Sequence, residues 1–221
     1  MTSSPRMLSS RILITPIVFI LLALAIGPLH AEEQTRDVPA FDSVVFGGSG
    51  TLKIMVGGDH SVVLEGDPRL LEEVETTVKG GRLLIKRDSD WSFFGRKDYG
   101  SLIARVRMPQ LDEAMMAGSG DLDVEGLNGG KTSLVIAGSG DIEAEGKLDF
   151  LELTINGSGE AEMPDLEVKD ADVTINGSGD VLVKVSGYLD ATINGSGDIE
   201  YIDEPEHVRS SVHGSGDIRQ R

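Results

Sequence analysis

From about residue 110 to the C-terminus, apolar and polar residues alternate, and the tripeptide Gly-Ser-Gly interrupts this alternation at nearly constant intervals. The tripeptides are centred on Ser49, Ser119, Ser139, Ser158, Ser178, Ser196 and Ser215, and the last six are separated by 20, 19, 20, 18 and 19 residues. A repeat of this length is typical of proteins built from stacked units, none of which buries a core alone.

Each unit contains two short segments with a period of two residues. In VTINGSGDVLV (173–183), Val and Ile alternate with Thr and Asn before the tripeptide, and the alternation resumes with Val181 and Val183. Such a period indicates half-buried strands, and no segment of 121–221 has a helical period. Two strands per unit, stacked about 4.8 Å from the next unit, predict an all-β, parallel β-solenoid. The coils have about 19 residues, and parallel crossovers favour a right-handed solenoid.

The tripeptide is expected to form the corner of each coil, because glycine bends sharply and lets neighbouring backbones approach closely. Inward Ile155, Ile175 and Ile193 should then stack on one another, one from each coil. The polar rows between them are Thr154, Thr174, Thr192 and Asn156, Asn176, Asn194. We interpret both rows as structural, since Thr favours strands and stacked Asn amides hydrogen-bond along the axis.

The first Gly-Ser-Gly, at Ser49, lies seventy residues before the second and fits the same template. We interpret it as an N-terminal coil of the same solenoid. The insertion that follows, at about 57–108, has other signals. Asp67 and Pro68 predict the start of a short helix, Gly80-Gly81 predicts a hairpin turn, and 101–109 predicts a strand.

The first 31 residues have the pattern of a secretory signal peptide. A start with two arginines precedes an apolar stretch at 12–27, and Ala31 stands directly before Glu32. We expect cleavage after Ala31. The alternative is an uncleaved anchor, for which the apolar stretch is short. The remaining chain, 32–221, is predicted to be a single β-solenoid domain with regular coils at about 110–221.

Charge and cysteine content narrow the classes of partner. The chain carries a formal net charge of −17, and the leader contains two basic residues and no acidic one, so the mature chain carries −19. Such a surface excludes nucleic acid and favours cations or neutral glycans. The chain has no cysteine, which excludes a disulfide framework and thiolate metal sites. We predict no membrane span after the leader.

An acidic residue follows each of the last six corners. These residues are Asp121, Asp141, Glu160, Asp180, Asp198 and Asp217. In register they form a column of like charges, which destabilises a sheet unless something offsets it. The favoured interpretation is that each carboxylate accepts hydrogen bonds from backbone N–H groups or from the Ser hydroxyl at the corner. The alternative is calcium binding between coils, with Asp141, Asp180 and Asp198 as candidate ligands.

The stretch DSDWSFFGRKDYG (88–100) holds four aromatic residues within nine positions: Trp91, Phe93, Phe94 and Tyr99. Its glycines and charges predict a loop. Aromatic side chains on a loop need cover, so they either close the solenoid core or form a contact surface for a sugar or a protein. They are the binding-surface candidates of the sequence.

The last coil departs from the acidic pattern. It contains Arg209, Arg219 and Arg221, and Ser210 stands where other coils have an apolar residue. Solenoids need ends that block further stacking, so we expect this coil to be the C-terminal cap.

Several segments together resemble one known family. They are FDSVVFGGSGTLKI, VVLEGDPRLLEEVETTVKGGRLLI, VRMPQLDEAMMAGSGDL and the TINGSGD units. The chain resembles, over about residues 36–218, the family called putative auto-transporter adhesin, head GIN domain. The resemblance implies an exported bacterial β-solenoid without established activity, and it supplies no catalytic residues.

These observations favour a non-enzymatic, exported cell-envelope module, periplasmic or at the cell surface, with a binding, structural or adhesive role. The partner would be an envelope glycan or protein, and no cofactor is expected. No metal-ligand or nucleophile–base spacing joins the four histidines. The alternative is a carbohydrate-active enzyme on a β-helix scaffold, since such scaffolds host enzymes that use clustered carboxylates.

Overall fold

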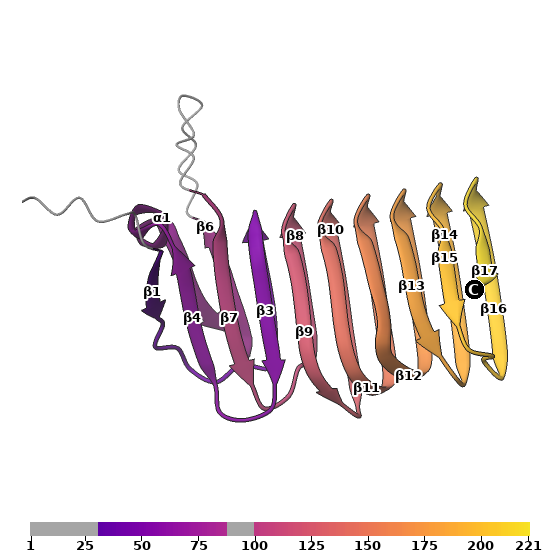
Figure 1. Ribbon diagram of the computed structural model, residues 1–221, viewed down its shortest axis with the longest axis horizontal. Helices are drawn as coiled ribbons and strands as arrows, with labels where there is room; N and C mark the ends of the chain where they lie inside the picture. Colours follow the sequence, from indigo (N-terminus) through magenta and orange to yellow (C-terminus); the bar gives the residue numbers. More distant parts are fainter. Residues whose placement is uncertain (1–30, 88–99) are drawn as a thin grey trace, which may run out of the picture.

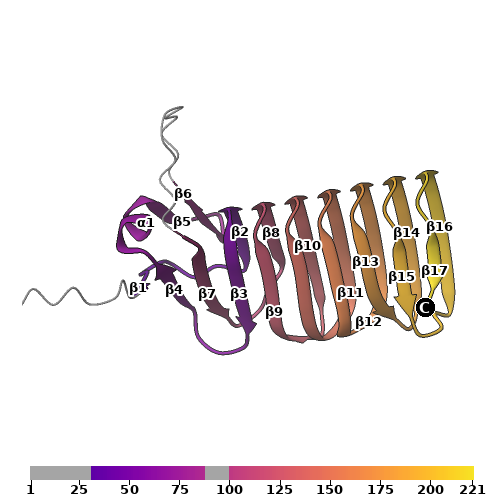
Figure 2. The ribbon, with the colours of Figure 1, turned by 45° about the horizontal axis from the view of Figure 1, so that its top comes forward.

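The computed structural model describes residues 31–87 and 100–221 and has the form of an elongated parallel β-solenoid (Figures 1 and 2). Its first part contains β1 (Glu32–Thr35), β2 (Ser43–Gly48), β3 (Gly50–Val56), β4 (Ser61–Gly66), α1 (Pro68–Glu73), β5 (Val74–Lys79), β6 (Arg82–Arg87) and β7 (Leu102–Met108). The coils continue with β8 (Glu113–Gly118), β9 (Asp121–Asn128), β10 (Lys131–Gly138), β11 (Asp141–Gly157), β12 (Glu160–Gly177), β13 (Asp180–Val185), β14 (Tyr188–Gly195), β15 (Ile199–Ile202), β16 (His207–Gly214) and β17 (Ile218–Gln220).

The solenoid has two parallel faces, because each coil contributes one strand before its corner and one after it. The first face follows the order β6, β2, β8, β10, β11, β12, β14, β16. The second face follows the order β7, β3, β9, β11, β12, β13, β15, β17. The long strands β11 and β12 take part in both faces. The predicted parallel β-solenoid is therefore confirmed.

The register of the coils is the one that the alternation predicts. Ile175 lies opposite Ile155 on one side and Ile193 on the other, and all three side chains are fully buried. Thr174, one residue away, lies on the outward row and is only partly covered. Apolar side chains from the two faces thus form one continuous core along the axis, which replaces the globular core of an ordinary domain.

The helix and the hairpin of the insertion are confirmed. The Asp67 carboxylate accepts a hydrogen bond of 2.9 Å from the backbone N–H of Arg69, which caps the first turn of α1. Strands β5 and β6 pair antiparallel and turn at Gly80 and Gly81, whose φ angles are +60° and +80°. Such angles are easily adopted only by glycine.

The insertion also extends the solenoid, which the sequence did not indicate. Strand β6 pairs in parallel with β2, and β7 pairs in parallel with β3, so both add a rung beyond the Ser49 coil. Inward side chains of these strands, among them Leu83 and Ala104, are fully buried. The Ser49 segment is a coil, as predicted, but it lies inside the stack rather than at its end.

The N-terminal end is closed by antiparallel strands. Strand β4 pairs antiparallel with β7, β1 pairs antiparallel with β4, and α1 lies at the same end (Figure 1). Buried Leu70 and Leu71 of α1 join the core. Among the described residues, no helix has the length and apolar content needed to cross a membrane.

Candidate functional site

The acids after the corners form a hydrogen-bonded ladder with the backbone. The Asp180 carboxylate accepts from the backbone N–H of Asp198 at 2.8 Å, and the Asp198 carboxylate accepts from the N–H of Asp217 at 2.9 Å. The Asp141 carboxylate accepts from the N–H of Glu160 at 3.2 Å. Each of these acids therefore holds the next coil, as the favoured interpretation predicted. Within residues 31–87 and 100–221, no group of three or more His, Cys, Asp or Glu residues is arranged to hold a metal ion.

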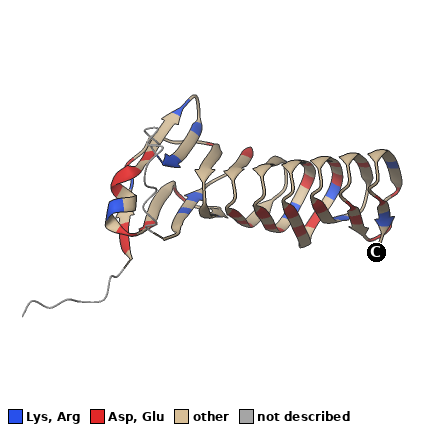
Figure 3. Ribbon diagram, turned by 90° about the horizontal axis from the view of Figure 1, so that it is seen from above, with Lys and Arg blue, Asp and Glu red and all other residues tan. Residues whose placement is uncertain are grey.

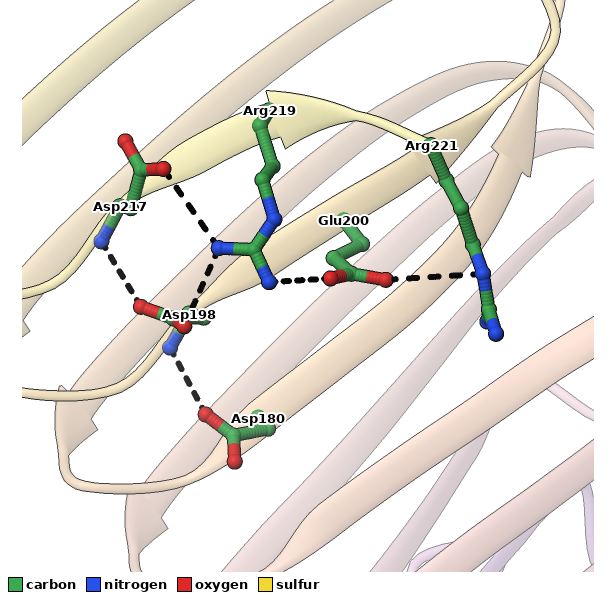
Figure 4. Close-up of polar contacts among 6 residues, drawn as sticks. All are labelled: Asp180, Asp198, Glu200, Asp217, Arg219 and Arg221. Carbon is green, nitrogen blue, oxygen red and sulfur yellow. Dashed lines mark hydrogen bonds and ion pairs between the residues drawn. The ribbon is translucent and has the colours of Figure 1, made fainter.

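Stacked acids still repel one another. The pKa of Glu160 is raised, first by burial and then by the charges of Glu162, Asp141 and Asp180. The column ends at Arg219, whose guanidinium lies 3.3 Å from the Asp198 carboxylate and 3.5 Å from that of Asp217 (Figure 4).

The same guanidinium also pairs with Glu200 (Figure 4). The last coil thus supplies the counter-charge that the acid column lacks elsewhere.

A second row of acids runs along the first face. Asp172 lies between Glu152 and Asp190, and its pKa is raised, first by burial and then by these two neighbours. Arg209 lies 3.4 Å from Asp190 at the C-terminal end of the row. Figure 3 shows acidic positions recurring along the coils and basic positions on the last strands.

The polar row of asparagines forms a ladder of its own. The Asn176 amide donates to Asn156 at 2.9 Å, and the Asn194 amide donates to Asn176 at 2.9 Å. These bonds tie successive coils together, so the Asn row is structural, as predicted.

A groove of about 570 Å³ lies over the outer side of β4, β7, β3 and β9, which pair with one another in that order. Outward side chains of three of these strands line it: Lys53, Met55, Arg105, Arg107, Asp123 and Glu125. The loop between β3 and β4 contributes His60 to the lining. The ring of His60 packs edge-on against Phe41 with 4.9 Å between ring centroids, and its Nε2 lies 2.7 Å from the Phe41 carbonyl oxygen.

The groove contains both signs of charge. Lys53 lies 2.6 Å from Asp123, and this hydrogen bond and the Asp123 charge raise the pKa of Lys53. Arg105 pairs with Glu65 at 2.5 Å.

The neighbouring Arg107 makes no ion pair with a carboxylate of the described chain. Its guanidinium instead lies 3.1 Å from the sulfur of Met55, which is 42% exposed. Arg107 therefore offers a guanidinium to an acidic group beside an apolar side chain.

A second hollow of about 450 Å³ continues this groove over β9, β11 and β12. It shares Lys53, Asp123 and Glu125 with the first hollow. The other charged residues of its lining are all acidic: Glu143, Glu145, Glu162 and Asp165. The groove is thus mixed in charge at the N-terminal end and acidic toward the middle of the solenoid.

The residues singled out from the sequence relate to this groove in different ways. Trp91, Phe93, Phe94 and Tyr99 lie outside the described residues. The calcium candidates Asp141, Asp180 and Asp198 form the backbone ladder and do not line the groove. Sequence reasoning missed the groove itself; the signal that could have found it is the set of basic residues Lys53, Arg105 and Arg107 at outward positions of their strands.

Comparison with solved structures finds the same fold in bacterial proteins. A putative adhesin from Bacteroides fragilis aligns with a TM-score of 0.72 and 20% identity, covering 86% of this chain and 97% of its own. A putative lipid binding protein from Parabacteroides distasonis aligns with a TM-score of 0.54 and 22% identity, covering 87% and 97%. A putative adhesin from Parabacteroides merdae aligns with a TM-score of 0.53 and 18% identity, covering 88% and 98%. At these identities the likeness concerns the fold alone.

A comparison with curated proteins finds no match. The family model described as putative auto-transporter adhesin, head GIN domain, matches residues 40–205. That match spans the Ser49 coil, the rung that the insertion adds and all the regular coils before the last one. Since it covers most of the solenoid, the chain belongs to the head GIN domain family of putative auto-transporter adhesins.

Proposed function

We propose that the chain is an exported, non-enzymatic binding module of the cell envelope with an adhesive role, and that its groove holds an extended polypeptide segment of the partner. The single observation that carries the proposal is the groove of about 570 Å³, whose walls carry both charges on rigid strands. The adhesin family and the adhesin neighbours support the same role. Leader-like residues 1–31 support export.

The chemistry of the groove favours a polypeptide over other ligands. Arg107 suits a carboxylate, while Glu125 and the acids of the second hollow suit lysine or arginine side chains. An extended peptide presents such charges at regular intervals, and parallel strands provide a straight floor for it.

A lipid or a glycan is the less favoured ligand. One structural neighbour is described as a putative lipid binding protein, but Met55 is the one exposed large apolar side chain among the described residues of the lining. A neutral glycan would give no charged partner to Arg107, Glu125 or the acids of the second hollow, which is costly for any of these groups that it desolvates.

The groove acids give the enzyme alternative little support of their own. Glu143 and Glu162 are directly opposed on neighbouring strands, as stacking alone requires. A pair working as acid and base would need environments that separate their two pKa values.

Binding of short extended peptides to the purified protein tests the proposal. The panel contains peptides of mixed charge, acidic, basic and uncharged composition, together with neutral and acidic polysaccharides. We expect saturable binding of mixed-charge peptides, and about tenfold weaker binding by Arg107→Glu, which corresponds to the loss of about 1.4 kcal/mol.

Lys79→Glu is the matched control, because it makes the same charge change at an exposed position at the end of β5, outside the groove lining. It should bind the peptides like the unmodified protein. Saturable binding of a polysaccharide alone, turnover of a polysaccharide, or equal losses in the two variants would each contradict the proposal.

A further inference from the structure

Within residues 31–87 and 100–221, no strand covers the outer edge of the last coil. Among the described residues, β16 pairs only with β14, and β17 pairs only with β15. Val208 and Val212 occupy the inward positions of β16, opposite buried Leu189 and Ile193, yet they are 42% and 40% exposed. The polar coil therefore ends the core without covering it, which corrects the expectation of a cap.

The free edge of β16 also presents unpaired backbone groups. In the inner coils, the backbone N–H and C=O groups of inward-facing residues are directed toward the following coil. For example, the N–H of Ile199 donates to the carbonyl oxygen of Asp217 at 2.9 Å. The backbone groups of outward-facing residues are directed toward the preceding coil. For example, the N–H of His207 donates to the carbonyl oxygen of Gly187 at 3.1 Å. Because the direction alternates along a strand, the N–H and C=O groups directed out of the open end belong to Val208, Ser210 and Val212.

The open end is also close to neutral, unlike the two stretches of coil before it. Residues 160–179 have a formal charge of −5, and residues 180–203 have −4. Residues 204–221 contain three acids and three arginines, so their net formal charge is zero. Arg209 and Arg219 further neutralise acids of the coil before them. Two copies of this chain could therefore meet at this end with little charge repulsion.

We propose that the open end binds the open end of a second copy of this chain, with the two β16 strands antiparallel about a twofold axis at Ser210. This register places Val208 of each copy opposite Val212 of the other, so the exposed valines cover one another. Ser210 lies opposite Ser210, and Arg209 lies opposite Ser211 rather than another arginine. The backbone groups that face out are those that hydrogen-bond in this register.

The proposed interface is small, and the assembly stops at two copies. Strand β16 has eight residues and is therefore about 26 Å long, and the two faces lie about 10 Å apart. Each copy thus buries a few hundred Å², below the roughly 800 Å² of a stable complex. We expect a dimer that forms in the micromolar range. It does not grow further, because the opposite end is closed by α1 and antiparallel strands.

A single cysteine tests this register, because the chain has none of its own. In the proposed dimer, two Cα atoms of residue 210 lie about 5.5 Å apart, within the range that a disulfide bridges. Purified Ser210→Cys should oxidise to a covalent dimer. Ser211→Cys is the matched control: its side chain lies on the outward row and is offset diagonally from its copy, so it should oxidise at least tenfold more slowly.

Sedimentation of the unmodified protein, Ser210→Pro and Val212→Lys provides the second measurement. Proline at 210 removes only a free N–H, which an edge strand tolerates, so melting curves should be unchanged. We expect a concentration-dependent dimer for the unmodified protein and monomers for both variants. If either variant unfolds, the comparison of oxidation rates between Ser210→Cys and Ser211→Cys tests the proposal instead.

A monomer at hundreds of micromolar, equal oxidation of the two cysteine variants, or assemblies larger than a dimer would each overturn the proposal. Peptide binding is independent of this result, since Arg107→Glu lies in the groove and should leave dimerisation unchanged.

Discussion

Substituting one corner glycine by alanine tests how closely the coils must stack. Gly177 has a φ of +145°, which costs any other residue about 1–3 kcal/mol. A Cβ there would lie 2.9 Å from the carbonyl carbon of Gly157 and closer still to its oxygen. That oxygen accepts the N–H of Ser178 at 2.8 Å, and Gly177 O accepts the N–H of Ser196 at 2.8 Å. Moving this corner away from its neighbours to make room for the Cβ breaks these two hydrogen bonds, which are worth about 1 kcal/mol each.

We therefore expect Gly177→Ala to lower the free energy of unfolding by about 3–5 kcal/mol. Gly57→Ala is the control, because Gly57 also has a positive φ, +116°, but a Cβ there meets no atom within 4 Å. It should cost only the backbone strain, about 1–3 kcal/mol. Urea unfolding followed by far-ultraviolet circular dichroism measures both. Equal losses would refute the argument that close stacking, rather than backbone conformation alone, requires glycine at the corner.

Three further outcomes follow from the coil geometry. Ile175→Ala should destabilise the protein by about 2–5 kcal/mol and Thr174→Ala by far less in the same urea assay; equal losses would mean that the inward row is misassigned. Folding raises the pKa of Asp172 above its ordinary value of 3.8. The contribution of this group to the free energy of unfolding is therefore greatest below pH 3.8 and decreases as the pH rises through the pKa of the folded state. Asp172→Asn should therefore raise the unfolding free energy at pH 7, by at most about 1 kcal/mol, and reduce the fall in stability across a pH series; a loss would contradict this sign. Millimolar calcium should leave the melting temperature unchanged, because the Asp180 and Asp198 carboxylates already accept backbone bonds; a rise that Asp180→Asn with Asp198→Asn abolishes would establish calcium binding instead.

Most of the fold is predictable from the repeat in the sequence. Alternation fixes which side chain faces inward, and a constant period places Ile155, Ile175 and Ile193 on top of one another. The role of the acids after the corners follows as well, because an in-register column of carboxylates needs donors and the corner backbone supplies them. These are nearest-neighbour properties, since each coil contacts only the coils beside it.

The groove and the two ends depend on pairings that no period predicts. Strand β7 lies beside β3, about fifty residues earlier in the chain, and only this order brings Arg107 next to Met55. The same order moves the Ser49 coil inside the stack. At the other end, the sequence indicated a polar coil, but exposure of Val208 depends on what lies above it. Local patterns determine how a strand faces, whereas only the tertiary structure decides which distant strand covers it and where the covering stops.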